Sequence, residues 1–118
     1  MCGGRVIYIV ENDRGVRDAL SLLLEGLGHH AISFADGGSF MSSVTPREGD
    51  VVFIDLKLPD MPGERVINKL RQTLVPAQIV AISGSSQFDL DRIVHENGIG
   101  NILRKPLEEK HILEFLPK

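Results

Sequence analysis

Short apolar runs alternate with longer amphipathic segments along the whole chain. Residues 6–10 and 51–54 are almost entirely apolar, which is typical of parallel strands that are buried on both faces. Residues 14–27 instead carry apolar side chains three and four positions apart, which predicts a helix with Asp13 as its N-cap and Gly28 at its end. The same reasoning predicts strands at 5–10, 30–34, 51–54, 78–82 and 102–103, and helices at 14–27, 38–44, 64–74, 88–97 and 108–116.

This alternation predicts a single α/β domain over residues 1–118. Five βα units in succession give a parallel sheet with helices on both faces. Ligands of such folds bind beyond the carboxyl ends of the strands, near the point where the strand order reverses. The residues that follow the predicted strands are therefore the first candidates for a functional site.

The composition excludes several classes of function. A content of 42% hydrophobic and 25% charged residues is too apolar for a disordered chain. The net charge of -3 argues against direct binding of nucleic acid, which requires a basic face. No apolar run approaches the roughly 20 residues that span a bilayer, and the first residues do not form a signal peptide. Cys2 is the only cysteine, which excludes an internal disulfide and fits a cytoplasmic location.

Polar side chains follow four of the five predicted strands. They are Glu11, Asn12 and Asp13 after the first strand, Asp55 after the third, Ser83 and Gly84 after the fourth, and Lys105 after the fifth. Carboxylate and amide oxygens suit Mg²⁺, and a carboxylate beside such a cation can attack phosphorus to form an aspartyl phosphate. The Ser83 hydroxyl, the Gly84 backbone N–H and the Lys105 ammonium are groups that hold phosphoryl oxygens.

With these motifs the chain resembles the receiver domains of bacterial response regulators over nearly its whole length. The resemblance rests on the cluster after the first strand, the run 51–55, the loop 58–63, and the pairs Ser83-Gly84 and Lys105-Pro106. It implies a flavodoxin-like doubly wound sheet of five strands in the order 2-1-3-4-5, and a cis peptide bond before Pro106. It also implies phosphorelay signal transduction, in which Asp55 accepts a phosphoryl group from a sensor histidine kinase or a phosphotransfer protein.

The same resemblance assigns roles to individual residues. Mg²⁺ is expected on Glu11, Asn12, Asp55 and the backbone carbonyl of Lys57, the phosphoryl group on Ser83, Gly84 and Lys105, and the conformational switch on Ser83 and Ile102. Further expectations are a DNA-binding output domain outside this chain and a phosphorylation-dependent homodimer. Such a receiver assists its own phosphotransfer and dephosphorylation and is not otherwise an enzyme. Residues 33–36 and 58–59 look similar to receivers of the nitrogen-fixation-regulator type.

Two positions depart from the family pattern. Asn12 stands where receivers usually carry a second acid that binds Mg²⁺ directly, so the expected metal affinity is lower. Its amide is either a weak ligand or a group that only stabilises the loop. Ile102 stands where receivers usually carry a switch aromatic, and it cannot make the same ring rotation.

Two other hypotheses remain beside the phosphorelay receiver. In the first, the chain is a pseudo-receiver, an interaction module of the same fold whose Mg²⁺-dependent phosphorylation is weak because of Asn12. In the second, it is a phosphatase of the haloacid-dehalogenase class, which also uses an aspartate nucleophile at a strand end. That class requires another aspartate two positions after the nucleophile, where this chain has Lys57.

Overall fold

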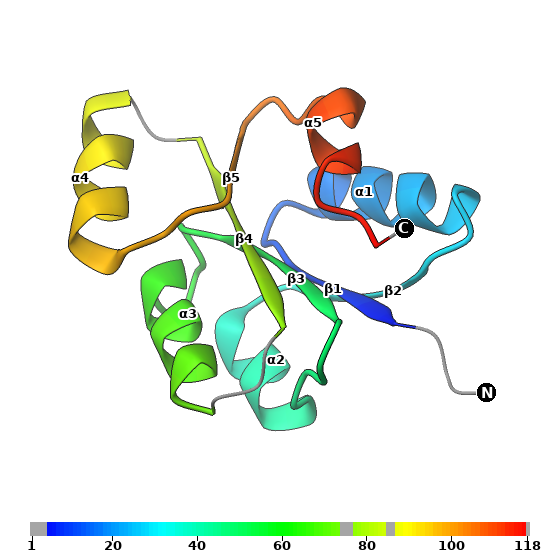
Figure 1. Ribbon diagram of the computed structural model, residues 1–118, viewed down its shortest axis with the longest axis horizontal. Helices are drawn as coiled ribbons and strands as arrows, with labels where there is room; N and C mark the ends of the chain where they lie inside the picture. Colours follow the sequence, from blue (N-terminus) through cyan, green and yellow to red (C-terminus); the bar gives the residue numbers. More distant parts are fainter. Residues whose placement is uncertain (1–4, 74–76, 85–86, 118) are drawn as a thin grey trace.

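Strands and helices alternate through the computed structural model, which describes residues 5–73, 77–84 and 87–117 (Figure 1). The strands are β1 (Val6–Val10), β2 (His30–Phe34), β3 (Val51–Asp55), β4 (Gln78–Ser83) and β5 (Ile102–Arg104). The helices are α1 (Arg14–Gly26), α2 (Gly37–Ser43), α3 (Gly63–Gln72), α4 (Gln87–Asn97) and α5 (Glu109–Leu113). The strands form one parallel sheet in the order β2-β1-β3-β4-β5, which confirms the predicted topology.

Alternate side chains of the central strands enter two separate hydrophobic clusters. Tyr8 and Val10 of β1 join the cluster beneath α2, α3 and α4, whereas Ile7 and Ile9 join the cluster beneath α1 and α5. Figure 1 shows these two sets of helices on opposite faces of the sheet. The burial of both faces explains why the central strands lack polar residues until they reach the edge of the sheet where they end.

The last helix is shorter than the sequence predicts. The apolar pattern indicates a helix over 108–116, but α5 covers only Glu109–Leu113. The amides of Phe115 and Leu116 donate to carbonyls three residues earlier, as in the tightened turn at a helix end. Pro117 follows, and a residue before proline is disfavoured in the helical conformation. The predicted end of α3 at Leu74 lies outside the described residues.

The loop between β3 and α3 folds back tightly onto the end of β3. The Gly63 amide donates to the Leu56 carbonyl at 2.9 Å, and Lys57 forms an antiparallel bridge with Pro62. A Cβ on Gly63 would lie 2.3 Å from the carbonyl oxygen of Asp55 and 2.7 Å from the Cα of Leu56. Only glycine allows this approach, so Gly63 fixes the path of the chain beside Asp55.

The same loop also holds the first turn of α2. The carboxylate of Asp60 accepts hydrogen bonds from the amides of Gly37, at 3.0 Å, and Gly38, at 2.8 Å. The hydrogen bond from Gly38, and to a lesser extent that from Gly37, holds the pKa of Asp60 below its usual value. The two glycines therefore begin a helix that is pinned to the β3–α3 loop, whereas the sequence places the start of this helix one residue later.

We expect Gly63→Ala to destabilise the protein, because its methyl group would overlap backbone atoms that are part of the sheet. Overpacking of this kind costs about 1–3 kcal/mol. Gly26→Ala is the control, since a Cβ there has no neighbour within 4 Å at the end of α1 and alanine favours helix. Urea unfolding should show a loss for the first variant and no loss for the second. Equal stability of Gly63→Ala and the wild type would contradict the tight packing of this loop.

Candidate functional site

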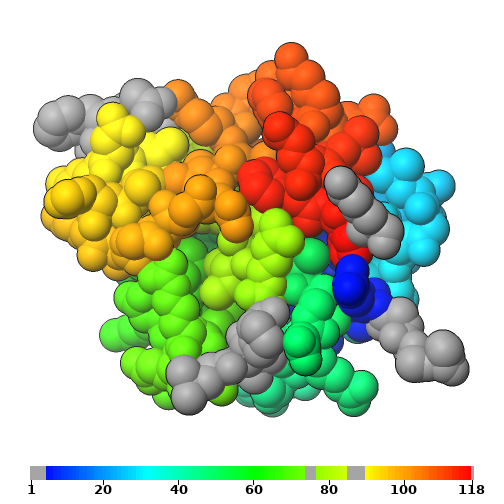
Figure 2. Space-filling view, in the orientation of Figure 1, coloured from blue at the N-terminus to red at the C-terminus, as the bar shows by residue number. Residues whose placement is uncertain are grey.

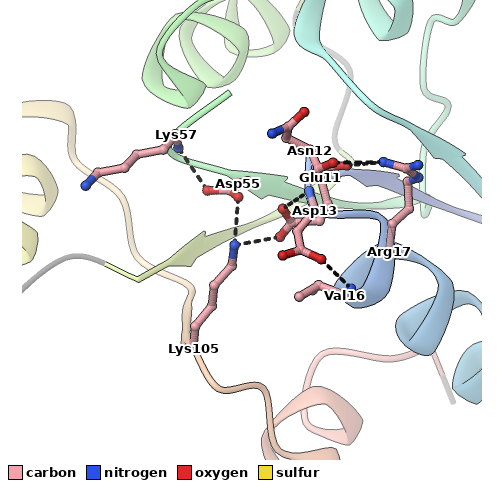
Figure 3. Close-up of polar contacts among 8 residues, drawn as sticks. All are labelled: Glu11, Asn12, Asp13, Val16, Arg17, Asp55, Lys57 and Lys105. Atoms are coloured by element: carbon pink, nitrogen blue, oxygen red, sulfur yellow. Dashed lines mark hydrogen bonds and ion pairs between the residues drawn. The ribbon is translucent and has the colours of Figure 1, made fainter. Parts of the chain in front are cut away.

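Three charged side chains meet where β1, β3 and β5 end (Figure 3). Glu11 directly follows β1, Asp55 is the last residue of β3, and Lys105 directly follows β5. They border a pocket of about 260 Å³ that is lined by Glu11, Asn12, Asp13, Asp55, Lys57, Gly84 and Lys105. The parallel sheet thus gathers at one edge residues that are far apart in the sequence, as the general rule for such folds predicts.

Lys105 lies between the two carboxylates. Its Nζ is 2.9 Å from Asp55 Oδ2 and 3.0 Å from Glu11 Oε1. The Lys105 side chain is 27% exposed, whereas those of Glu11 and Asp55 are only 1% and 7% exposed. One ammonium therefore contacts two carboxyl groups that have little access to water.

Burial and charge shift the pKa values of this group in directions that can be traced. Burial raises the pKa of the Glu11 carboxyl above its usual value, and the neighbouring Asp55 adds to this effect. For Lys105, burial alone would lower the pKa. The attraction of Asp55 and Glu11 outweighs burial, so the pKa of Lys105 is raised and the ammonium form is favoured.

The second oxygen of Asp55 is also held. Asp55 Oδ1 accepts a hydrogen bond of 2.9 Å from the backbone amide of Lys57, while Oδ2 accepts that from Lys105. With one bond to each oxygen, the carboxylate has a fixed orientation at the wall of the pocket. The Lys57 side chain is exposed and points away from Asp55 in Figure 3, so it is the Lys57 backbone that contacts this aspartate.

The segment after β1 presents its residues to the pocket in different ways. Glu11 is fully buried, and its Oε2 accepts a 3.0 Å hydrogen bond from the Asp13 amide. The Asp13 carboxylate accepts a 3.1 Å bond from the Val16 amide, which confirms it as the N-cap of α1. Asn12 is exposed at the rim, where the sequence motif expects a metal ligand.

Sequence reasoning missed Arg17. Its guanidinium nitrogen Nη1 lies 2.8 Å from the carbonyl oxygen of Glu11 and 3.2 Å from that of Asn12. An arginine on the exposed side of a predicted helix gives no indication that it folds back over the preceding loop. The one indication in the sequence is its position four residues after the Asp13 cap. At that distance, about one helical turn into α1, a side chain can reach back to the residues before the helix.

The remaining predicted residues belong to β4, β5 and the residues that follow these strands, and of them only Gly84 and Lys105 line the pocket. Ser83 is buried, and its carbonyl accepts the Lys105 amide at 2.8 Å. Gly84 is exposed and adjoins Lys105 in the lining of the pocket. The Lys105-Pro106 bond is cis, as the motif implies. Ile102 is partly buried against the cluster beneath α4 and pairs with Ala81.

The donor set fits a small hard cation better than a soft metal. Glu11 Oε1 accepts no hydrogen bond from the described residues, although the Lys105 ammonium is within ion-pair distance. It is therefore a buried oxygen with coordinating capacity to spare. No three His, Cys, Asp or Glu side chains converge on one point within residues 5–73, 77–84 and 87–117. Two carboxylates with waters are nevertheless enough for Mg²⁺, and Asn12 and Lys57 can add neutral oxygens.

Comparison with known proteins identifies the family. The model of the response regulator receiver domain matches residues 7–116. The chain is 26% identical over 112 residues to the tetrathionate response regulatory protein TtrR of Salmonella typhimurium, an alignment that covers 95% of this chain and 54% of TtrR. It is 24% identical over 110 residues to the transcriptional regulatory protein FixJ of Bradyrhizobium diazoefficiens, covering 93% and 54% respectively. The chain thus spans about half the length of these relatives.

Solved structures agree with the sequence relatives. A CheY-like receiver domain protein from Methanospirillum hungatei superimposes with a TM-score of 0.82 at 21% identity, covering 95% of this chain and 90% of that protein. The response regulator StyR gives the same TM-score at 23% identity, covering 95% and 57%. None of the described helices is long and apolar enough to cross a membrane. The chain belongs to the response regulator receiver domain family, whose members are the signalling modules of two-component systems.

Proposed function

We propose that residues 1–118 act as one phosphorelay receiver, in which Asp55 accepts a phosphoryl group and a change of conformation controls an output domain or partner. The observation that supports this best is the contact of Lys105 with both Asp55, at 2.9 Å, and Glu11, at 3.0 Å. The donor is a sensor histidine kinase or a phosphotransfer protein, and the compartment is the cytoplasm.

The pocket supplies what phosphoryl transfer needs, which is mainly positioning and neutralisation of charge. A carboxylate oxygen of Asp55 attacks the phosphorus, the P–N bond of the donor phosphohistidine breaks, and the imidazole leaves with that electron pair. Lys105 already contacts Asp55 and can follow the negative charge onto the phosphoryl oxygens. Ser83 and the Gly84 amide adjoin Lys105 and complete the phosphate-binding group.

Mg²⁺ is the cofactor of the proposal. Glu11 and Asp55 would hold it through carboxylate oxygens, Asn12 through its amide oxygen and Lys57 through its backbone carbonyl. When bound, the cation neutralises charge on the transferring phosphoryl group. When no cation is bound, Lys105 holds the two carboxylates in place, because its ammonium contacts both of them.

A second cavity suggests where the phosphoryl donor docks. It has a volume of about 400 Å³, lies between α1 and the segment from Lys105 to α5, and is lined mostly by apolar side chains such as Leu20, Leu23 and Ile112. Lys105 borders both this cavity and the phosphoacceptor pocket. A helix of the donor that rested here would reach Lys105, which contacts Asp55.

The output surface proposed is the face formed by α4, β5 and α5. Figure 2 shows these segments as one continuous surface, from yellow through orange to red. Ile102 of β5 packs against the cluster beneath α4, and Ser83 ends the neighbouring strand. We therefore place the switch between Ser83 and Ile102, with a DNA-binding output domain outside this chain or a phosphorylation-dependent homodimer as its reader. Among the relatives, the NtrC of Klebsiella pneumoniae is a DNA-binding transcriptional regulator.

Asn12 favours one alternative, a pseudo-receiver with weak Mg²⁺-dependent phosphorylation. The side chain at this position is exposed at the rim and neutral, so the pocket has one carboxylate fewer than receivers usually carry. The two functions differ in one observable, the extent of phosphorylation in the presence of Mg²⁺.

We expect acetyl phosphate and Mg²⁺ to label the wild-type protein on Asp55 alone. Intact-mass and peptide mass spectrometry should show one hydroxylamine-labile phosphoryl adduct in the wild type and none in Asp55→Asn. Asp50→Asn is a control, because Asp50 is a buried aspartate near the opposite ends of the strands, where it accepts the Val6 amide. Labelling of Asp55→Asn to the level of the wild type would contradict the assignment, and absence of labelling in all proteins would favour the pseudo-receiver.

We expect Asn12→Asp to tighten Mg²⁺ binding, because it places a carboxylate at the rim position where receivers usually carry a second acid. One added charge beside a divalent cation should strengthen binding by about tenfold, or roughly 1.4 kcal/mol. Asn68→Asp makes the same charge change on the exposed side of α3 and should leave Mg²⁺ affinity nearly unchanged. Isothermal titration calorimetry measures both. If the two variants bind Mg²⁺ equally, residue 12 is not a ligand.

A further inference from the structure

The carbonyl groups at the end of β1 turn towards α1. The carbonyls of Glu11 and Asn12 both accept hydrogen bonds from Arg17 Nη1, at 2.8 and 3.2 Å. One guanidinium nitrogen thus bridges two consecutive peptide groups at the point where the acidic segment leaves the sheet. Figure 3 shows Arg17 approaching this segment from the side away from Lys105.

We infer that Arg17 is a positioning residue for the metal pocket, which it acts on by fixing the backbone of Glu11 and Asn12. This inference rests on the proposed function, since it assigns Arg17 a part in Mg²⁺ binding. Because both backbone carbonyls are bonded to Arg17, Glu11 and Asn12 present their side-chain oxygens to the pocket and not their carbonyl oxygens. Arg17 therefore determines which oxygens face the cation without touching it.

Two neighbouring contacts show that the loop is held from both ends. The Asp13 amide donates to Glu11 Oε2 at 3.0 Å, and the Asp13 carboxylate caps α1 through the Val16 amide. Arg17 closes the same loop from the next turn of α1. If Arg17 is lost, Asp13 still caps the helix, but the peptide group of Asn12 loses its link to α1. The expected consequence is a looser orientation of the side chain at position 12.

The charge of Arg17 acts in the opposite direction to its hydrogen bonds. A positive charge close to the pocket repels Mg²⁺, so removing it should tighten metal binding if charge were its only effect. Positioning predicts the reverse, weaker binding after removal. Mutating a residue that orients a metal ligand typically lowers the metal affinity by a factor of about 10 to 100. Whether Mg²⁺ affinity rises or falls when Arg17 is removed therefore separates the charge effect from the positioning effect.

The test compares Arg17→Met with Arg17→Lys and Arg14→Met in the full chain. Arg17→Met keeps the length of the side chain without its donors, and Arg17→Lys keeps the charge but replaces the planar guanidinium with a compact ammonium. Arg14→Met removes a charge from the same helix, where the Arg14 side chain is 85% exposed and pairs with Asp18 at 3.5 Å. Mg²⁺ affinity is measured by calorimetry, and the exchange of the Asp13 amide proton is followed by NMR in metal-free protein.

We expect Arg17→Met to weaken Mg²⁺ binding by roughly tenfold, Arg17→Lys to recover part of the loss, and Arg14→Met to leave binding unchanged or slightly tighter. The Asp13 amide should exchange faster in Arg17→Met than in the wild type. Mg²⁺ binding as tight as or tighter than that of the wild type in Arg17→Met would overturn the inference. If the wild type itself binds no Mg²⁺, the proposed metal site fails, and an unchanged Asp13 exchange rate would then refute the positioning role independently.

Discussion

The contact of one ammonium group with two buried carboxylates organises this molecule's functional edge. Lys105 Nζ lies 2.9 Å from Asp55 and 3.0 Å from Glu11, and both acids are almost inaccessible to water. Burying a carboxylate is costly in free energy unless it is paired, and Lys105 is the charged partner that Glu11 and Asp55 share.

The scaffold around this contact explains why its three members meet. Each one stands at the end of a different parallel strand, and the loops behind them are short and tightly bonded. Gly63 lets the β3–α3 loop pass against the Asp55 carbonyl, where a Cβ would be only 2.3 Å away. The Lys105 amide is tied to the Ser83 carbonyl at 2.8 Å, which extends the pairing of β4 and β5 by one step. A shift of either loop would separate the ammonium from its carboxylates.

Much of this architecture could be predicted from the sequence, because apolar runs and amphipathic periods specify buried strands and covering helices directly. The strand ends then indicate Asp55 and Lys105. The apolar pattern overestimates the length of α5, because it continues to Leu116 although the backbone tightens after Leu113 and Pro117 disfavours helix at the residue before it. Arg17 could not be predicted, because its role depends on the direction of two carbonyl groups rather than on the spacing of side chains.

The titration of Lys105, followed through its side-chain resonances by NMR, tests this account most directly. In the wild type the carboxylates outweigh burial, so the pKa should lie above the ordinary value of 10.5. In the double variant Glu11→Gln/Asp55→Asn only burial remains, and the pKa should fall below 10.5. The same pKa in both proteins would show that Lys105 does not hold the two carboxylates together.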